Sequence, residues 1–218
     1  MQERRSNRER TEEMRGRLIA AARALFVDRG YADTGTPEIV AAAGVTRGAL
    51  YHHFADKQAL FRAVVETEAA VVAAAIEDAA AAGDAESTNG GTSDGIPAAP
   101  GHGIRRLVAG ARAYLVAMAV PGRTRLLLVE APAVLGATEV RAIDGGHAER
   151  TLRAGLEEAI EAGELRALPL PALTSLLSAL FDRAALDAAA DGDAGKAITV
   201  IEALLAGLAP PPARGGTG

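Results

Sequence analysis

An all-α fold is predicted by the composition of this chain and by the helical spacing of its apolar residues. Hydrophobic residues make up 49% of the 218 residues, whereas aromatic residues make up only 3%. Ala and Leu dominate and β-branched residues are sparse, so local propensity favours helices over strands. We expect an N-terminal three-helix unit that contains a helix-turn-helix, followed by a larger helical domain.

The composition also bears on compartment and chemistry. The chain has no Cys, which excludes disulfide frameworks, thiolate nucleophiles and zinc-thiolate sites. Residues 1–17 are rich in Arg and Glu and lack the apolar segment of a signal peptide, and no later run is long and apolar enough to span a bilayer. We therefore expect a cytoplasmic protein without a membrane partner.

Charge is divided unevenly along the chain, whose formal net charge is -5. Residues 1–62 hold 11 Lys and Arg against 8 Asp and Glu, whereas the remaining residues hold 12 against 20. A basic N-terminal unit on an acidic body suits a nucleic-acid partner, because phosphates need cations only at the contact surface. An ordinary scatter of surface charge would explain these numbers equally well.

The first forty-four residues carry two helix signals. Thr11, followed by two glutamates, is a good helix start, and apolar residues keep helical spacing from there to Gly30. The preceding residues 1–10 are expected to form a flexible arm, either a basic arm for the minor groove of DNA or a solvated tail. Thr36, followed by proline, repeats the start signal, and Gly44 ends a short second helix.

A third helix is predicted to present one face to the core and the other to a partner. Thr46 caps its start, and Leu50 and Phe54 lie one turn apart on the face that packs. Arginine can pair with guanine or phosphate, and a glycine lets the helix backbone approach a groove. These residues share the opposite arc: Arg47, Gly48, Tyr51 and His52. Residues 11–55 thus form a predicted helix-turn-helix domain for double-stranded DNA.

This N-terminal segment closely resembles the tetracycline-repressor (TetR) family of transcription regulators. The likeness runs in register from LIAAA at residues 18–22 through AGVTRGALYHHF at residues 43–54 to Phe61. A looser likeness to the family's regulatory domain covers RLLLVEAPAVLG at residues 125–136 and AGEL at residues 162–165.

The resemblance implies roles for individual residues. Thr36, Tyr51 and Lys57 match phosphate-contacting positions of the family, and Arg47, Gly48 and His52 match positions that face the groove. Thr46 completes the predicted DNA-binding set. A cation in the first turn of a helix meets the positive end of the helix dipole, and a DNA phosphate beside Lys57 would reverse that cost.

The rest of the chain is predicted to be helical apart from two segments. We expect a connecting helix over 56–82, a flexible loop over 83–103, a regulatory and dimerisation domain over 104–209 and a disordered tail over 210–218. Within the regulatory domain, helical patterning and turn residues predict helices at 104–120, 123–135, 139–162, 171–190 and 194–208.

The last two predicted helices are apolar over wide arcs, which predicts a homodimer. Such helices must be covered on two sides, and a twofold partner is the commonest cover, although a larger monomer core would also serve. The expected four-helix interface uses these residues: Leu173, Leu176, Leu177, Leu180, Ile198, Ile201 and Leu205.

A ligand cavity is predicted among the middle helices. With so few aromatic rings, we expect a small apolar effector, either a flexible aliphatic molecule or a small polar-apolar one, instead of a large flat molecule. The candidate wall and polar contacts are Tyr114, Met118, Arg125, Leu127, Glu130, Val134 and His147, each of which could equally be plain core or surface.

These features favour a transcriptional repressor that an effector releases from a palindromic operator. A ligand-independent or activating regulator and a non-specific architectural DNA binder are the alternatives. An enzyme is not favoured, because four His, no Cys and no Gly-rich phosphate loop leave no catalytic or metal-ligand spacing. We expect no metal and no cofactor, and Gly145-Gly146-His147 is interpreted as a helix boundary.

Overall fold

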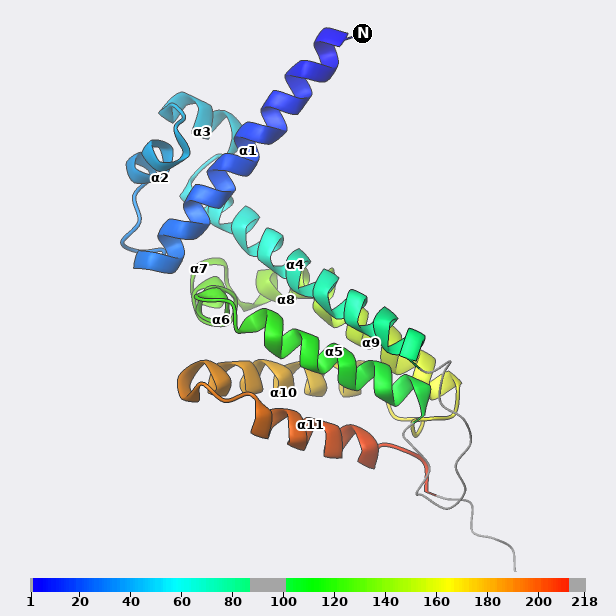
Figure 1. Ribbon diagram of the computed structural model, residues 1–218. Coiled ribbons are helices and arrows are strands. Elements are labelled where there is room, and N and C mark those ends of the chain that lie inside the picture. Colours follow the sequence, from blue (N-terminus) through cyan, green and yellow to red (C-terminus); the bar gives the residue numbers. More distant parts are fainter. Residues whose placement is uncertain (1, 87–100, 212–218) are drawn as a thin grey trace, which may run out of the picture. The chain divides into compact units, whose positions relative to one another are not determined.

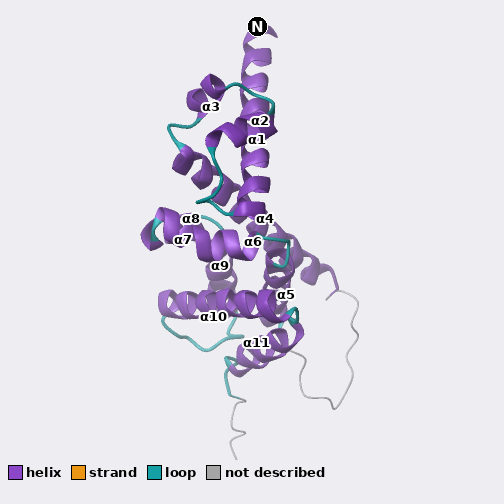
Figure 2. Ribbon diagram, turned by 90° about the vertical axis from the view of Figure 1, so that its left-hand side faces the viewer, coloured by secondary structure: helices purple, strands orange, loops and turns teal. Residues whose placement is uncertain are grey.

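The computed structural model describes residues 2–86 and 101–211, and their regular structure is entirely helical (Figures 1 and 2). The elements are α1 (Gln2–Arg29), α2 (Thr36–Ala43), α3 (Arg47–His53), α4 (Lys57–Glu86), α5 (His102–Met118), α6 (Arg123–Arg125), η2 (Leu126–Glu130), α7 (Ala131–Leu135), α8 (Ala137–Gly145), α9 (Ala148–Glu161), α10 (Leu170–Asp191) and α11 (Gly195–Gly207). None of the described helices is long and apolar enough to cross a membrane.

The chain divides into two compact units, and the division differs from the predicted one. Unit 1 contains the described residues up to Ala70 together with residues 120–143, and unit 2 contains residues 71–119 and the described residues from Asp144 onward. Residues 120–143 were expected to belong to the regulatory domain. They join unit 1 because Leu126 and Ala131 are buried in the same apolar cluster as Phe26 and Phe61.

The core of unit 1 is built by bulky side chains from the first helices. Phe26 of α1 and Phe61 of α4 meet edge to face with ring centroids 5.2 Å apart, and Tyr31 lies 4.9 Å from Phe61. Ile39 of α2 and Leu50 of α3 are fully buried in the same cluster. Figure 1 shows α2 and α3 lying on one side of α1, which is the arrangement that this shared core requires.

The first helix begins earlier than predicted. It starts at Gln2, so residues 2–10 are part of α1, and the predicted flexible arm over 1–10 is wrong for the residues that the structure describes. Thr11 lies inside the helix and does not cap it. Arg, Glu and Gln are good helix formers in isolation, so a segment rich in them can extend a helix upstream of an apparent start signal.

The predicted helix over 123–135 forms, with a change of hydrogen-bond register inside it. Residues 126–130 are π-helical, and the N–H of Ala131 donates to the carbonyl of Leu126, five residues earlier. Pro132 follows immediately and has no N–H to donate. Single π-turns of this kind occur as short bulges inside otherwise α-helical segments.

Unit 2 consists of the rest of α4 with α5, α9, α10 and α11. Its core contains Leu107 and Leu115 of α5, Leu156 of α9, Phe181 of α10 and Leu205 of α11, all buried. The helix predicted over 139–162 is divided into α8 and α9 at Gly146 and His147, which confirms the helix boundary expected there. The two ends of the predicted loop are helical, because α4 reaches Glu86 and α5 begins at His102. Residues 87–100 of that predicted loop and 212–218 of the predicted tail lie outside the described residues.

Candidate nucleic-acid interface

The turn between α2 and α3 requires a glycine. Gly44 has φ 62° and ψ 40°, in the left-handed region, and its N–H donates to the carbonyl of Ala41 at 3.2 Å. Arg17 of α1 donates to the carbonyl oxygens of Ala43 at 2.5 Å and Gly44 at 3.1 Å. A Cβ at Gly44 would lie 2.9 Å from the Arg17 guanidinium. The turn is therefore shaped by the glycine backbone and held by Arg17.

Helix α3 has one buried and one exposed edge, as its sequence predicts. The N–H of Ala49 donates to the Thr46 hydroxyl at 3.2 Å, which confirms Thr46 as the cap. Leu50 is fully buried and Phe54 is 5% exposed. The exposed residues on the other side are Arg47, Gly48, Tyr51 and His52. We call these four residues and Thr36 the outer edge.

Side chains within the outer edge contact one another across α2 and α3. The Arg47 guanidinium lies 5.5 Å from the centroid of the Tyr51 ring. Hydrogen bonds with the side chains of Thr36 and Arg47 lower the pKa of Tyr51 from its ordinary value. Because Thr36 is the first residue of α2, these contacts join the start of α2 and the exposed edge of α3 into one polar, cationic surface.

Lys57, predicted to contact a DNA phosphate, makes polar contacts within unit 1. Its ammonium donates to the carbonyl oxygens of Tyr31 at 2.8 Å and Thr34 at 3.0 Å, and it lies 4.1 Å from the Tyr31 ring centroid. These carbonyls and the ring face offset the unfavourable position of a cation at the start of α4. Lys57 therefore fastens the turn between α1 and α2, which places α2.

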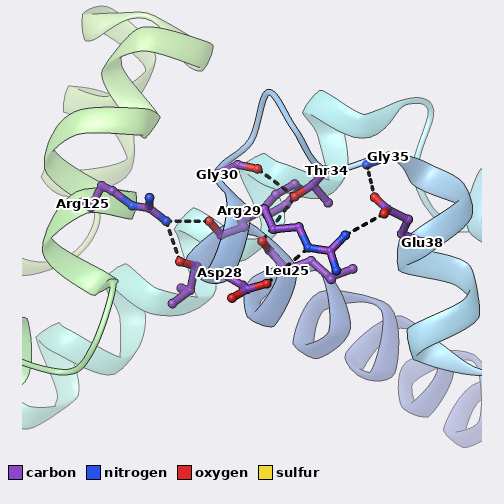
Figure 3. Close-up of polar contacts among 10 residues, drawn as sticks. Leu25, Asp28, Arg29, Gly30, Thr34, Gly35, Glu38 and Arg125 are labelled. Carbon is purple, nitrogen blue, oxygen red and sulfur yellow. Dashed lines mark hydrogen bonds and ion pairs between the residues drawn. The ribbon is translucent and has the colours of Figure 1, made fainter.

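The α1–α2 turn is also held by polar contacts of its own (Figure 3). The Thr34 hydroxyl donates to the carbonyl oxygen of Gly30 at 2.7 Å. Arg29 of α1 pairs with Glu38 of α2 at 2.7 Å, and the other oxygen of Glu38 accepts from the N–H of Gly35 at 3.0 Å. The Gly35 hydrogen bond and the Arg29 charge lower the pKa of Glu38 from its ordinary value.

Arg125 and Glu130, predicted as effector contacts, instead hold the carboxyl end of α1. Arg125 donates to the carbonyl oxygens of Phe26 at 3.0 Å and Val27 at 2.6 Å (Figure 3). Glu130 accepts from the N–H of Tyr31 at 3.1 Å, and its other oxygen lies 3.5 Å from Arg125. The last carbonyls of a helix lack partners within it, which explains why an arginine suits this place.

A buried ion network in unit 1 escaped the sequence analysis. Glu68 of α4 is 5% exposed and pairs with Arg23 of α1 and Arg123 of α6, each at 2.8 Å. Burial acts to raise the pKa of Glu68, but the two arginines outweigh it and the pKa lies below its ordinary value. No local signal marks these residues, because the partners lie 45 and 55 positions apart in the chain.

The predicted effector residues are not brought together. A cavity of about 500 Å³ lies within unit 2, and Tyr114 is the only one of the seven that lines it. Leu127 and Val134 pack against the core of unit 1, Met118 is 2% exposed in α5, and His147 precedes α9 as its N-cap. Arg125, Leu127, Glu130 and Val134 miss the cavity because residues 120–143 belong to unit 1.

The predicted dimer residues divide between core and surface. Leu177, Ile201 and Leu205 are buried within the chain, so their assignment to an interface is wrong. Leu173, Leu180 and Ile198 are half-buried, and Leu176 is 71% exposed. Val200 and Leu204 of α11 are also exposed, at 55% and 48%. Apolar spacing predicted that both segments are helical but not which of their faces remains exposed.

Comparison with known proteins matches this arrangement of a helix-turn-helix and a helical second unit. Residues 18–64 match the family of bacterial regulatory proteins, tetR family, and residues 104–208 match the tetracyclin repressor-like C-terminal domain. The transcriptional activator FasR of Mycolicibacterium smegmatis is 48% identical over 63 residues, a match that spans 29% of this chain and 29% of FasR.

Solved structures extend the likeness to nearly the whole chain. A TetR-family transcriptional regulator from Pectobacterium atrosepticum is 32% identical, with 94% of this chain and 98% of that chain covered at a TM-score of 0.64. RolR in complex with resorcinol shares the fold at 18% identity and a TM-score of 0.65, with coverage of 94% and 91%. The fold and the exposed α3 define a helix-turn-helix transcription regulator. This chain belongs to the TetR family.

Proposed function

We propose that this protein is a sequence-specific regulator, most simply a repressor, that leaves a palindromic operator when a small effector binds unit 2. The observation that carries the proposal is the outer edge: Arg47, Tyr51 and His52 are exposed on α3 while Leu50 is fully buried behind them. An exposed helix edge of this kind, anchored by its own core, fits the major groove of DNA.

The chemistry of the outer edge supports contacts with both bases and phosphates. The Arg47 guanidinium can donate two parallel hydrogen bonds to guanine, and His52 lies one helical turn beyond Gly48 on the same side. Tyr51 and Thr36 supply hydroxyls for phosphate oxygens, which fix the register of the helix on the duplex. Gly48, without a side chain, leaves room for the backbone to approach the groove.

Dimerisation is supported by exposed apolar side chains on the last two helices. Leu176 of α10 and Val200 and Leu204 of α11 are large, apolar and at least 48% exposed. Val200 and Leu204 are one helical turn apart, so they share a face. A twofold pair of these faces would cover them and would link two outer edges, which is the basis of palindromic recognition.

Effector control is supported by the cavity in unit 2. Ile76 and Glu77 of α4 contribute to its lining, and α4 is unbroken from Lys57 to Glu86. Because Lys57 fastens the turn before α2, the same helix carries both a cavity wall and a support of the outer edge. A ligand that binds one conformation of α4 more tightly would shift the population away from the DNA-binding form.

The test is a selection of bound fragments from random DNA, followed by titration of the selected site. We expect a palindromic site, and we expect Arg47→Ala to weaken binding by about 1–3 kcal/mol, the free energy that one bidentate pair with guanine supplies. Arg183→Ala is the matched control, because Arg183 is an exposed arginine of unit 2 that pairs with Asp187. Equal affinity for all sequences would contradict specific recognition and favour an architectural DNA binder.

A further inference from the structure

The cavity in unit 2 has an aromatic side. Of the seven aromatic residues of the chain, five lie in residues 1–61, and the other two, Tyr114 of α5 and Phe181 of α10, both line the cavity. Their ring centroids are 6.2 Å apart and the rings are tilted by 40°. Leu107 of α5 and Ile76 of α4 add aliphatic surface. The sequence suggested a shortage of rings, yet the structure gathers those available at this cavity.

The cavity lining carries more negative than positive side chains. Five carboxylates and two arginines line it. Arg106 pairs with Glu158 at 2.7 Å, and Arg150 lies 3.5 Å from Glu77, which also accepts from the Thr151 hydroxyl. Both arginines therefore have their own carboxylate partner. The carboxylates that remain belong to three residues: Asp144, Glu149 and Asp182.

These three carboxylates repel one another. Asp182 accepts a hydrogen bond from the Tyr114 hydroxyl at 2.5 Å, and Asp144 accepts one from the backbone N–H of Glu149. Within the part of the chain that the structure describes, none of the three forms an ion pair. Burial, followed by repulsion from Asp182 and Glu149, raises the pKa of Asp144 to about 6, and burial also raises the pKa of Asp182.

We propose that this cavity binds an organic cation, with its apolar body against Tyr114 and Phe181 and its cationic group among Asp144, Glu149 and Asp182. A positive group there would relieve the repulsion, and the aromatic faces attract cations as well as apolar groups. A neutral ligand would leave the carboxylates uncompensated, and an anion would add to the repulsion. The inference deepens the proposed function, on which it rests for its regulatory meaning, because it specifies the class of effector.

The proposal is tested with three probes that share one alkyl chain and differ in charge: octylammonium, 1-octanol and octanoate. Each is titrated into the full-length protein by calorimetry at about pH 7.5, where an alkylamine is cationic. We expect octylammonium to bind at least about tenfold more tightly than 1-octanol, and octanoate to bind most weakly. Equal affinities, preference for octanoate, or no binding of octylammonium would overturn the proposal.

Variants identify the carboxylates that bind. Asp182→Asn keeps an oxygen that accepts from the Tyr114 hydroxyl, so it removes charge with little change of packing. The substitution should weaken the binding of octylammonium by roughly tenfold and leave the affinity for 1-octanol unchanged. Asp187→Asn is the control, because Asp187 lies on the same helix, is exposed and does not line the cavity. Glu149→Gln on α9, with Glu157→Gln as its control, provides a second, independent pair.

DNA is absent from these titrations, so they separate this proposal from the proposed function. Arg47→Ala should bind octylammonium as the wild type does, even where it no longer binds the operator. If octylammonium binds through Asp182 but does not release the selected DNA, the cavity assignment stands and the regulatory function fails. If the wild type binds the operator but not octylammonium, the cation proposal fails and DNA recognition stands.

Discussion

The two units differ in what surrounds a carboxylate that is shielded from water: Glu68 of unit 1 is buried, and Asp144 and Asp182 of unit 2 are half-buried. In unit 1, Glu68 lies between two arginines, and its pKa is lower than usual because Arg23 and Arg123 favour the charged form. In unit 2, no arginine among the described residues pairs with Asp144 or Asp182, and burial raises the pKa of both. The paired Glu68 carboxylate holds α1, α4 and α6 together. The carboxylates of unit 2, without an ion-pair partner among the described residues, leave a site where a cationic ligand can bind.

Energetics explain why both arrangements persist. Two charges that are removed from water must recover the cost of desolvation through good geometry, and Glu68 does so with two ion pairs of 2.8 Å. Asp144 and Asp182 do not recover that cost within the chain, so unit 2 gives up stability at the cavity. Functional sites commonly carry such a cost.

The largest expected effect is the loss of the network in unit 1. Glu68→Gln removes the charge that pairs with Arg23 and with Arg123, which is 7% exposed, and should lower the free energy of unfolding by about 3–5 kcal/mol. Urea denaturation, monitored by circular dichroism, measures this free energy of unfolding. Glu77→Gln is the control on the same helix, because its pair with Arg150 is exposed and should contribute less than about 1 kcal/mol. Equal destabilisation of the two variants would contradict a buried network.

The next effect is a gain of stability in unit 2. Asp144 has an ordinary pKa of 3.8, which the fold raises to about 6. The protein therefore keeps its full stability below the ordinary pKa and loses part of it as the pH rises toward about 6. Asp144→Asn removes this loss and should stabilise the protein by up to about 3 kcal/mol near neutral pH, given about 1.4 kcal/mol per pKa unit.

The free energy of unfolding, measured at a series of pH values between about 3 and 8, checks the direction of this pH dependence. The wild type should lose stability relative to Asp144→Asn as the pH rises through that interval, and the two should converge at the acid end. Glu68 acts with the opposite sign, since its lowered pKa stabilises the fold above its ordinary pKa and this contribution is lost on acidification. A wild type that gains stability over Asp144→Asn as the pH rises would contradict the assignment.

The smallest effect tests where Arg125 belongs. Arg125→Met removes two hydrogen bonds to the end of α1 and should cost about 1 kcal/mol, because the arginine is partly exposed. Octylammonium binding should not change, since Arg125 does not line the cavity. Calorimetric titration and urea denaturation of the same sample give both values. A change in octylammonium affinity with unchanged stability would contradict this placement and would indicate that Arg125 contacts the effector.

Local signals in the sequence were sufficient for the helix-turn-helix. The Thr46 cap, the Gly44 turn and the one-turn spacing of Leu50 and Phe54 all concern residues within a few positions of one another, and the structure has each of them as predicted. The same spacing identified the exposed edge of α3. Helix bounds elsewhere were close for the same reason, apart from the start of α1, the end of α4 and the break between α8 and α9.

Contacts between distant positions could not be read from the sequence. The hydrogen bonds from Arg125 to the end of α1 span 98 and 99 positions, and no periodic pattern in the sequence predicts them. Apolar spacing also gave no way to tell Leu177, which faces the core, from its exposed neighbour Leu176. The acidic lining of the predicted cavity was missed for a related reason, because Asp144, Glu149 and Asp182 come from three separate helices and lie together only in the folded protein.

The central claim is that the outer edge of α3 touches DNA, and a crosslinking measurement tests it most directly. The chain has no native Cys, so His52→Cys carries a photoreactive label at a single known position. We predict crosslinks from this label to bases within each half of the selected palindrome, and none from the same label at Asp187→Cys on α10. The account would be contradicted if the label at His52→Cys did not crosslink to DNA that the protein binds, or if the labels at the two positions crosslinked equally.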